Sequence, residues 1–293
     1  MKTKIKFIHI GFPKCGSTFL QSEVFDKIDG INAITVGGKN CQIPQCLSYM
    51  TYCQDPYFDA EKVNKELNEI PDDFNGISNE GFTAFISPTI MAKRLKNAFG
   101  DIKILIVLRN QKSILLSHYL HDIKIGYALS FERWLGRLFN SLRYQSFMFS
   151  HTIDAYNKEF GEKNVKVVLF EELFNEETTT DILDFTGMPK NKLDEIEYDL
   201  KVNAAYSPWS LVLTRWFNRN FGTKENQRAG FLYEIYRYRV VPKIDRLYSM
   251  LGGKKKSNYF NDSILAMIKE WYHEDNKRLT KILDRDLSDK GYL

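Results

Sequence analysis

The chain has 293 residues, of which 43% are hydrophobic and 27% are charged, and its formal net charge is +4. This length is sufficient for one large α/β domain or two small ones with a substantial core. The small basic excess suits an anionic ligand, but it lacks the dense Lys/Arg stripe expected of a protein that binds duplex nucleic acid.

Neither a metal site nor a membrane anchor is expected. The sequence has four cysteines, and Cys41, Cys46 and Cys53 lack the CxxC pairs and the nearby histidine of a zinc site. Reduced thiols in a cytoplasmic protein are therefore the expectation. No signal peptide is recognisable, and no apolar run approaches the roughly 20 residues that a transmembrane segment needs. Peripheral membrane contact stays open, and the sequence predicts no oligomeric state.

The first predicted strand leads into the most informative turn of the chain. The apolar run at residues 4–10 predicts a buried strand, and the turn GFPKCG at residues 11–16 follows it. A helix is expected to begin directly afterwards, at Ser17 and Thr18. Backbone N–H groups and a helix N-terminus then converge on one point, which is the arrangement of a phosphate-binding loop.

The position of the lysine in this turn indicates which anion is bound. Gly11 and Gly16 have the spacing of a nucleoside-triphosphate P-loop, but Ser17 stands where that loop has its lysine. The lysine lies inside the turn instead, as Lys14. We therefore expect an anion other than a nucleoside triphosphate.

Further strands and helices alternate along the chain. Residues 37–73 are polar and are expected to form an irregular excursion that lines a substrate cleft. Residues 103–108 and 165–170 predict two more buried strands, with helices over 113–123 and within 130–160. This alternation predicts an α/β fold with a central parallel sheet flanked by helices, and ligands beyond the carboxyl ends of the strands.

The strand at residues 103–108 ends in Arg109, where a P-loop enzyme would have an aspartate for magnesium. An arginine repels a metal ion and can bind a phosphate through two hydrogen bonds. Ser117 follows two helical turns later and could present its hydroxyl to the same anion. Two anion sites at neighbouring strand ends predict a ligand with two separated anionic groups and no need for magnesium.

The C-terminal third is aromatic and basic over residues 209–250 and closes with a helix predicted over 261–283. The aromatic and basic part is expected mostly to form amphipathic helices with inward aromatic rings, although contact with a glycan or a lipid headgroup stays open. No linker divides the chain. We therefore expect a single domain, 1–293, with 37–73 and 209–250 as excursions on the acceptor side.

Several of these segments together resemble the PAPS-dependent sulfotransferases, where PAPS is 3′-phosphoadenosine-5′-phosphosulfate. Residues 12–20 resemble the 5′-phosphosulfate loop of that family, and residues 107–119 resemble its 3′-phosphate element. Residues 251–259 and 268–279 are similar to a lysine-containing phosphate loop and to the closing helix of the carbohydrate sulfotransferases. The resemblance implies a P-loop-like three-layer fold and sulfuryl transfer to a hydroxyl or amine, preferably of a saccharide-bearing acceptor in a bacterial-type cytoplasmic enzyme.

The resemblance also implies a role for individual residues. Lys14 would stabilise the leaving oxygen as the bond to sulfur breaks, and no metal would take part. The 5′-phosphate would be held by Lys14, Ser17 and Thr18 with the backbone N–H groups of Cys15 and Gly16. The 3′-phosphate would be held by Arg109, Ser117, Lys255 and Lys256. Adenosine 3′,5′-bisphosphate would leave as the product.

Glu80 is the candidate for the base that removes the proton of the acceptor. Its segment, ISNEGFTA at residues 77–84, resembles the glutamate segment of the heparan-type enzymes. Gly81 and Phe82 stand where a lysine normally follows, which changes the local charge. A histidine base, as in the sulfotransferases of small molecules, is the alternative, but His9 is expected to be packed inside its strand and His118 to anchor its helix.

Two further functions stay open. A P-loop nucleotide kinase would require magnesium and the missing loop lysine. A binding protein of the same fold could have kept the pocket and lost the base.

Overall fold

The computed structural model describes residues 5–35, 44–199, 206–221, 235–253 and 259–292. The chain forms two compact units. The first unit contains Met1–Asn110, Met148–Val202 and Glu274–Tyr292. The second unit contains Gln111–Phe147, Asn203–His273 and Leu293.

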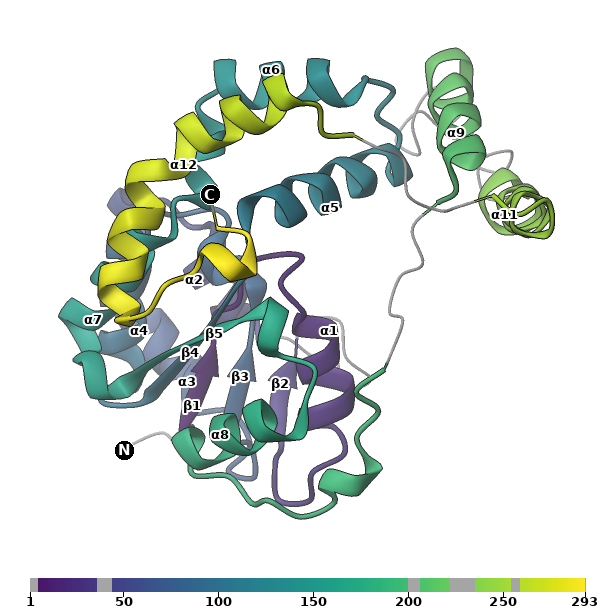
Figure 1. The fold of residues 1–293 in the computed structure, drawn as a ribbon. Helices are drawn as coiled ribbons and strands as arrows, with labels where there is room; N and C mark the ends of the chain where they lie inside the picture. The colour runs from purple at the N-terminus through teal and green to yellow at the C-terminus, as the bar shows by residue number, and fades with distance from the viewer. Residues whose placement is uncertain (1–4, 36–43, 200–205, 222–234, 254–258, 293) are drawn as a thin grey trace. The chain divides into compact units, whose positions relative to one another are not determined.

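A parallel sheet of five strands forms the centre of the first unit (Figure 1). Its strands are β1 Phe7–His9, β2 Ala33–Thr35, β3 Gly76–Ser78, β4 Lys103–Leu108 and β5 Val165–Leu169. They lie in the order β2-β3-β1-β4-β5, and every neighbouring pair is parallel. The predicted parallel sheet is thus confirmed. The sequence had not indicated β2 and β3, which are short and have no apolar run of their own.

Buried side chains explain why the predicted strands could be recognised. All residues from Ile104 to Leu108 are buried, as expected of a strand covered on both faces. Close packing also explains why residue 76 is a glycine. Gly76 pairs with Phe7 in the sheet. A Cβ atom at residue 76 would lie 2.4 Å from the Phe7 ring, so only glycine fits here.

Helices flank this sheet. The helices of the first unit are α1 Ser17–Phe19, continued by the π-helical turn η1 Leu20–Phe25, then α2 Gln45–Tyr52, α3 Ala60–Leu67, α4 Pro88–Phe99, α7 Phe149–Phe160 and α8 Glu176–Thr186. Its short 3-10 helices are η2 Asp55–Tyr57, η3 Glu80–Thr83, η5 Glu162–Asn164, η6 Phe170–Glu172, η7 Leu193–Glu195 and η9 Ser288–Lys290. The helix α7 packs on β4 and β5, and α8 packs on β4.

The expectation of an irregular segment at 37–73 was wrong for α2 and α3. Asp59 begins α3 by accepting hydrogen bonds from the N–H groups of the first turn. Val63 and Leu67, four residues apart, then turn one face of α3 inward. Residues 37–43 of that segment lie outside the described part of the chain.

Helices alone form the second unit, as far as its described residues go. They are α5 Gln111–Lys124, α6 Phe131–Asn140, η4 Arg143–Phe147, α9 Pro208–Phe221, the π-helical turn η8 Tyr236–Val240, α11 Val241–Met250 and the first half of α12 Asp262–Leu283. The helical region predicted over 130–160 is therefore interrupted. Leu142 adopts a left-handed backbone conformation, with φ of 57°. A helix cannot continue through such a residue, so α6 ends before it.

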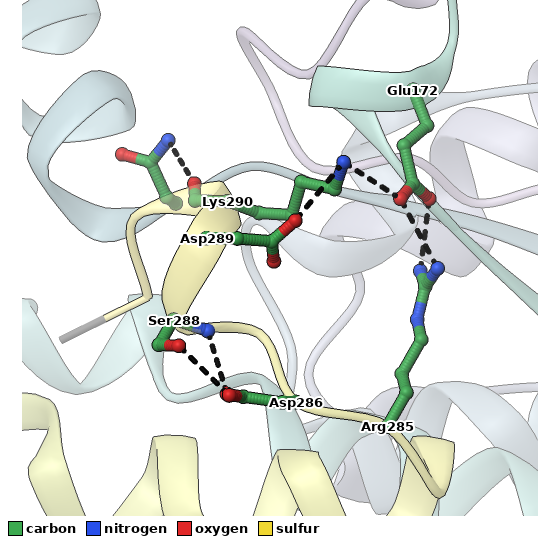
Figure 2. Close-up of polar contacts among 7 residues, drawn as sticks. Glu172, Arg285, Asp286, Ser288, Asp289 and Lys290 are labelled. Atoms are coloured by element: carbon green, nitrogen blue, oxygen red, sulfur yellow. Dashed lines mark hydrogen bonds and ion pairs between the residues drawn. The ribbon is translucent and has the colours of Figure 1, made fainter.

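The C-terminal turn is fixed to the ends of two strands of the first unit. Figure 2 shows Glu172, which follows β5, accepting hydrogen bonds from both terminal nitrogens of Arg285 at 3.2 and 3.0 Å. The Asp286 carboxylate accepts from the N–H and the hydroxyl of Ser288, the first residue of η9. The carbonyl of Lys290 accepts a hydrogen bond at 3.1 Å from the side-chain amide of Asn110, two residues after the end of β4. The last residues thus stabilise the sheet edge at which ligands are expected.

Candidate active site

The turn between β1 and α1 has the backbone of an anion-binding loop. Lys14 and Gly16 both adopt left-handed conformations, with φ of 71° and 87°. The helix begins immediately afterwards, since Leu20 donates its N–H to the Gly16 carbonyl. A Cβ atom at residue 16 would lie 2.5 Å from Cδ2 of Leu173, so this position requires glycine for two reasons.

Ser17, the first residue of α1, contacts the candidate base directly. Its hydroxyl donates a hydrogen bond to Oε1 of Glu80. Glu80 begins η3, which Asn79 caps by accepting from the Gly81 N–H at 2.8 Å. Thr83 of the same turn donates to the Gly11 carbonyl at 3.4 Å. The loops that follow the neighbouring strands β1 and β3 are therefore joined at one edge of the sheet.

The surroundings of Glu80 change the acidity of its carboxyl group. Burial raises the pKa of Glu80 from 4.5 to about 7, and the positive charge of Lys14 acts in the opposite direction. A carboxyl group with a pKa near neutrality can both accept and release a proton, which is the property of a general base. The structure thus brings Lys14, Ser17 and Glu80 together, as the assigned roles require.

Arg109 supports the loop from the end of β4. Its Nη1 donates to the carbonyl of Lys14 at 3.0 Å, and its guanidinium lies 4.0 Å from the centre of the Phe170 ring. Burial lowers the pKa of Arg109, but a guanidinium remains charged at neutral pH. Arg109 was expected to contact a phosphate. In this structure it contacts the backbone of the loop lysine.

Asn110 and Glu171 belong to the same edge, although they were not among the candidate residues. Oε1 of Glu171 accepts from the Asn110 N–H at 3.0 Å and from its side-chain amide at 2.7 Å. Glu171 follows the last residue of β5 by two positions. The rule that ligands bind at the carboxyl ends of parallel strands, applied to this third strand, would have identified it.

His9 is a packed strand residue, as expected. It is fully buried, and its Nδ1 lies 2.8 Å from the Ser78 hydroxyl, which also accepts from the Gln21 amide at 2.9 Å. Burial lowers the pKa of His9 to about 3, so the ring stays neutral. Its place inside the core keeps His9 away from solvent and does not suit it to act as a base.

The remaining candidate residues are placed as follows. Cys15 is buried, its N–H donates to the Phe12 carbonyl at 3.2 Å, and burial raises the pKa of its thiol. Thr18 is exposed on α1, and Ser117 lies in α5 of the second unit. Lys255 and Lys256 lie outside the described residues. In the part of the chain that is described, no cluster of His, Cys, Asp or Glu has the arrangement of a metal site, and no helix has the length and apolarity of a membrane span.

Three sulfotransferases are among the solved structures that match this chain. A sulfotransferase from Alicyclobacillus acidocaldarius matches with a TM-score of 0.62 and 16% identity over 98% of both chains. Mouse sulfotransferase SULT7A1, complexed with PAP, matches with a TM-score of 0.45 and 18% identity over 84% of this chain and 89% of its own. The sulfotransferase domain from the curacin biosynthetic pathway matches with a TM-score of 0.39 and 11% identity over 87% of this chain and 100% of its own.

Sequence comparison identifies the family. No curated protein matches the chain significantly in sequence. The family described as the sulfotransferase domain matches residues 4–205, which include the anion loop, Glu80, Arg109 and Ser117. This match covers more than half of the chain, and the first solved structure above shares its fold. The chain therefore belongs to the sulfotransferase domain family and is a sulfotransferase.

Proposed function

We propose that this sulfotransferase moves a sulfuryl group from PAPS to a hydroxyl or amine of a carbohydrate-containing acceptor. The observation that carries the proposal is the contact between the anion loop and Glu80, a carboxyl whose pKa is about 7. One edge of the sheet thus holds a cation, a helix N-terminus and a base. These are the groups that in-line transfer of an anionic group to a protonated nucleophile requires.

Glu80 takes the proton of the acceptor in this proposal. A hydroxyl has a high pKa, so it becomes a sufficient nucleophile only when its proton is removed during attack. The Arg109 contact to the Lys14 carbonyl holds the backbone of Lys14, and the Lys14 ammonium lies close enough to Glu80 to act on the pKa of that carboxyl group. A fixed positive charge stabilises negative charge more strongly in the transition state, where it develops on the leaving oxygen, than in the ground state.

The loop and the strand ends would hold the two anionic groups of the donor, which supplies the activated sulfuryl group. Lys14, Ser17, Thr18 and the backbone of Cys15 and Gly16 would bind its 5′ end. Arg109, Ser117, Lys255 and Lys256 would bind its 3′-phosphate. The matched residues 4–205 include parts of both units, which supports a single functional domain.

Thermal shift distinguishes this proposal from a P-loop kinase. Adenosine 3′,5′-bisphosphate at 100 times its dissociation constant should stabilise the protein by about 2.7 kcal/mol without magnesium. A kinase would instead be stabilised by ATP in a magnesium-dependent way. If ATP with magnesium stabilises the protein and adenosine 3′,5′-bisphosphate does not, the proposed donor is wrong.

Incubation with 35S-labelled PAPS and a panel of oligosaccharides then tests the acceptor. Label in a saccharide is the expected result. A protein that binds adenosine 3′,5′-bisphosphate but transfers no label to any acceptor, including those of a cell extract, would instead fit a binding protein that lost its base.

A further inference from the structure

Two helices of the second unit expose an unusual number of large apolar side chains. On α9, Trp209, Val212 and Trp216 are spaced by three and four residues and therefore form one stripe. Leu247, Met250 and Leu251 are exposed at the end of α11, and Met250 is 75% exposed. The expectation that the aromatic rings of this region mostly point inward is correct for Tyr236 but wrong for Trp209 and Trp216.

The two helices pack against each other (Figure 1), and their exposed apolar side chains are together called the α9–α11 surface below. Trp209 of α9 contacts Tyr248 of α11 with ring centres 5.1 Å apart. The Phe217 and Tyr236 rings stack at 4.5 Å, and the Thr214 and Tyr236 hydroxyls lie 2.9 Å apart. The inward side of α9 therefore packs against η8. The exposed apolar stripe lies on a helix whose other side is held by these contacts.

Two cation-lined hollows accompany this surface within the second unit. The first has a volume of about 560 Å³ and is lined by Lys124, Arg237 and Arg246. Asp245 also lines it, and its Oδ1 accepts the Ser207 N–H at 2.9 Å just before α9 begins.

The second hollow has a volume of about 480 Å³ and repeats this chemistry. It is lined by Arg133, Arg215 and Arg219, with Glu132 as the acidic residue. Across the described ranges, none of the arginines of either hollow forms an ion pair with a carboxylate. The helices that carry the exposed apolar side chains therefore also carry arginines without a carboxylate partner among the described residues, Arg215 and Arg219 on α9 and Arg246 on α11.

We propose that this surface binds the face of an anionic lipid membrane. Tryptophan and aliphatic side chains would enter the region between headgroups and acyl chains, and the arginines would bind lipid phosphates. A carbohydrate chain is the competing ligand for arginines beside aromatic rings. It would not account for the exposed Val212, Leu247, Met250 and Leu251, because sugars stack on flat rings, whereas acyl chains accommodate branched and unbranched aliphatic groups alike.

Vesicle sedimentation with the full chain tests the proposal. The wild type should sediment with phosphatidylcholine vesicles that contain about 30% phosphatidylglycerol and not with pure phosphatidylcholine, and added salt should weaken the binding. Arg246→Glu and Val212→Glu should each weaken it at least about tenfold. Lys93→Glu, an exposed lysine of α4, changes charge by the same amount as Arg246→Glu and should leave binding unchanged.

Circular dichroism verifies that each variant is folded. Folding is expected because all three substituted residues are exposed. Equal binding to both kinds of vesicle, no binding to either, or an equal loss in Lys93→Glu would overturn the proposal. So would a heparin fragment that binds the wild type and Val212→Glu equally while vesicles bind neither, because the arginines would then serve a polyanionic glycan. Adenosine 3′,5′-bisphosphate binding is measured separately and is not affected by either result.

Discussion

The Ser17 hydroxyl donates a hydrogen bond to the Glu80 carboxylate, across 63 positions in the sequence. This contact joins the first residue of the anion-loop helix to the carboxyl group proposed as base. The proposed base therefore lies within one side-chain contact of the loop that would hold the donor. The following predictions test how much of the chemistry depends on this arrangement.

Glu80→Gln should lower kcat by about 10²- to 10⁴-fold, because an amide cannot accept the acceptor proton. The affinity for adenosine 3′,5′-bisphosphate should stay within about threefold of the wild type. Steady-state kinetics and isothermal titration calorimetry measure the two quantities. Glu69→Gln, at an exposed position of the same unit, is the matched control and should keep full activity. A Glu80→Gln enzyme with normal kcat would remove Glu80 from its role.

The pH dependence of kcat/KM should follow the ionisation of Glu80. Since a base must be deprotonated, activity should rise with pH and level off above about 7, the value to which burial raises its pKa. A profile without a transition between about pH 6 and 8 contradicts this assignment.

Whereas activity should rise with pH, the free energy of unfolding should fall as pH rises from about 4.5 to about 7. The pKa of Glu80 is raised in the folded state, from 4.5 to about 7, so the folded chain binds more protons than the unfolded chain between these values. The free energy of unfolding should therefore fall as pH rises through this window, by up to about 3 kcal/mol from this group. Urea titrations at several pH values measure the slope, and Glu80→Gln should flatten it. An unchanged slope in the variant would show that the carboxyl group ionises freely.

Lys14→Asn should separate activity from stability. Asparagine tolerates the left-handed backbone of residue 14, whose φ is 71°, better than lysine does, so the melting temperature should be maintained or raised. The rate of sulfuryl transfer should fall by at least about 10²-fold, because the fixed charge at the leaving oxygen is lost. Lys192 has φ of 54° in the same unit and serves as the control, since Lys192→Asn should keep full activity. A normal kcat in Lys14→Asn would contradict the leaving-group assignment.

Arg109→Lys should show whether Arg109 contacts the 3′-phosphate or acts only through the loop. A lysine cannot both contact the Lys14 carbonyl and lie flat on Phe170, as the guanidinium does at 3.0 and 4.0 Å. Direct contact predicts a larger loss of affinity for adenosine 3′,5′-bisphosphate than for adenosine 5′-monophosphate, by about tenfold. Equal losses for both nucleotides would make Arg109 a positioning residue alone. Calorimetry with the two nucleotides decides between these outcomes.

Gly16→Ala should be more costly than another glycine substitution with similar backbone strain. A methyl group at residue 16 would meet Leu173 at 2.5 Å, whereas Gly187, which is also in the left-handed region, has no atom within 4 Å of its hypothetical Cβ. Gly16→Ala should therefore destabilise the protein by about 1–3 kcal/mol more than Gly187→Ala. Denaturant unfolding of both variants measures the difference, and equal losses would mean that Leu173 moves aside freely.

The strands were predictable where burial is continuous along the chain. The strand predicted over residues 103–108 has the same bounds as β4, because five consecutive buried side chains leave an apolar run. The strands β2 and β3 escaped prediction because neither has an apolar run of its own, whereas β1, which is equally short, lies within the apolar run at residues 4–10. Their presence depends on hydrogen bonds with neighbouring strands, which are not encoded locally.

Individual residues of the candidate site could be predicted from the sequence, but the contacts between them could not. The glycine spacing around Lys14 and the arginine at the end of a strand are local signals, and the resemblance to a family added Glu80. Asn110 and Glu171 were missed because their contact depends on β4 and β5 being neighbours.

Local sequence was sufficient to establish the anion loop and the parallel α/β class of the fold, since glycine spacing and apolar runs act over a few residues. Which loops meet follows from the order of the strands, and that order depends on the whole chain. Because β3 pairs with β1, Glu80 reaches Ser17. The acidity of the Glu80 carboxyl group also depends on the fold, because a pKa responds to the water that distant segments exclude and to the charges that they supply.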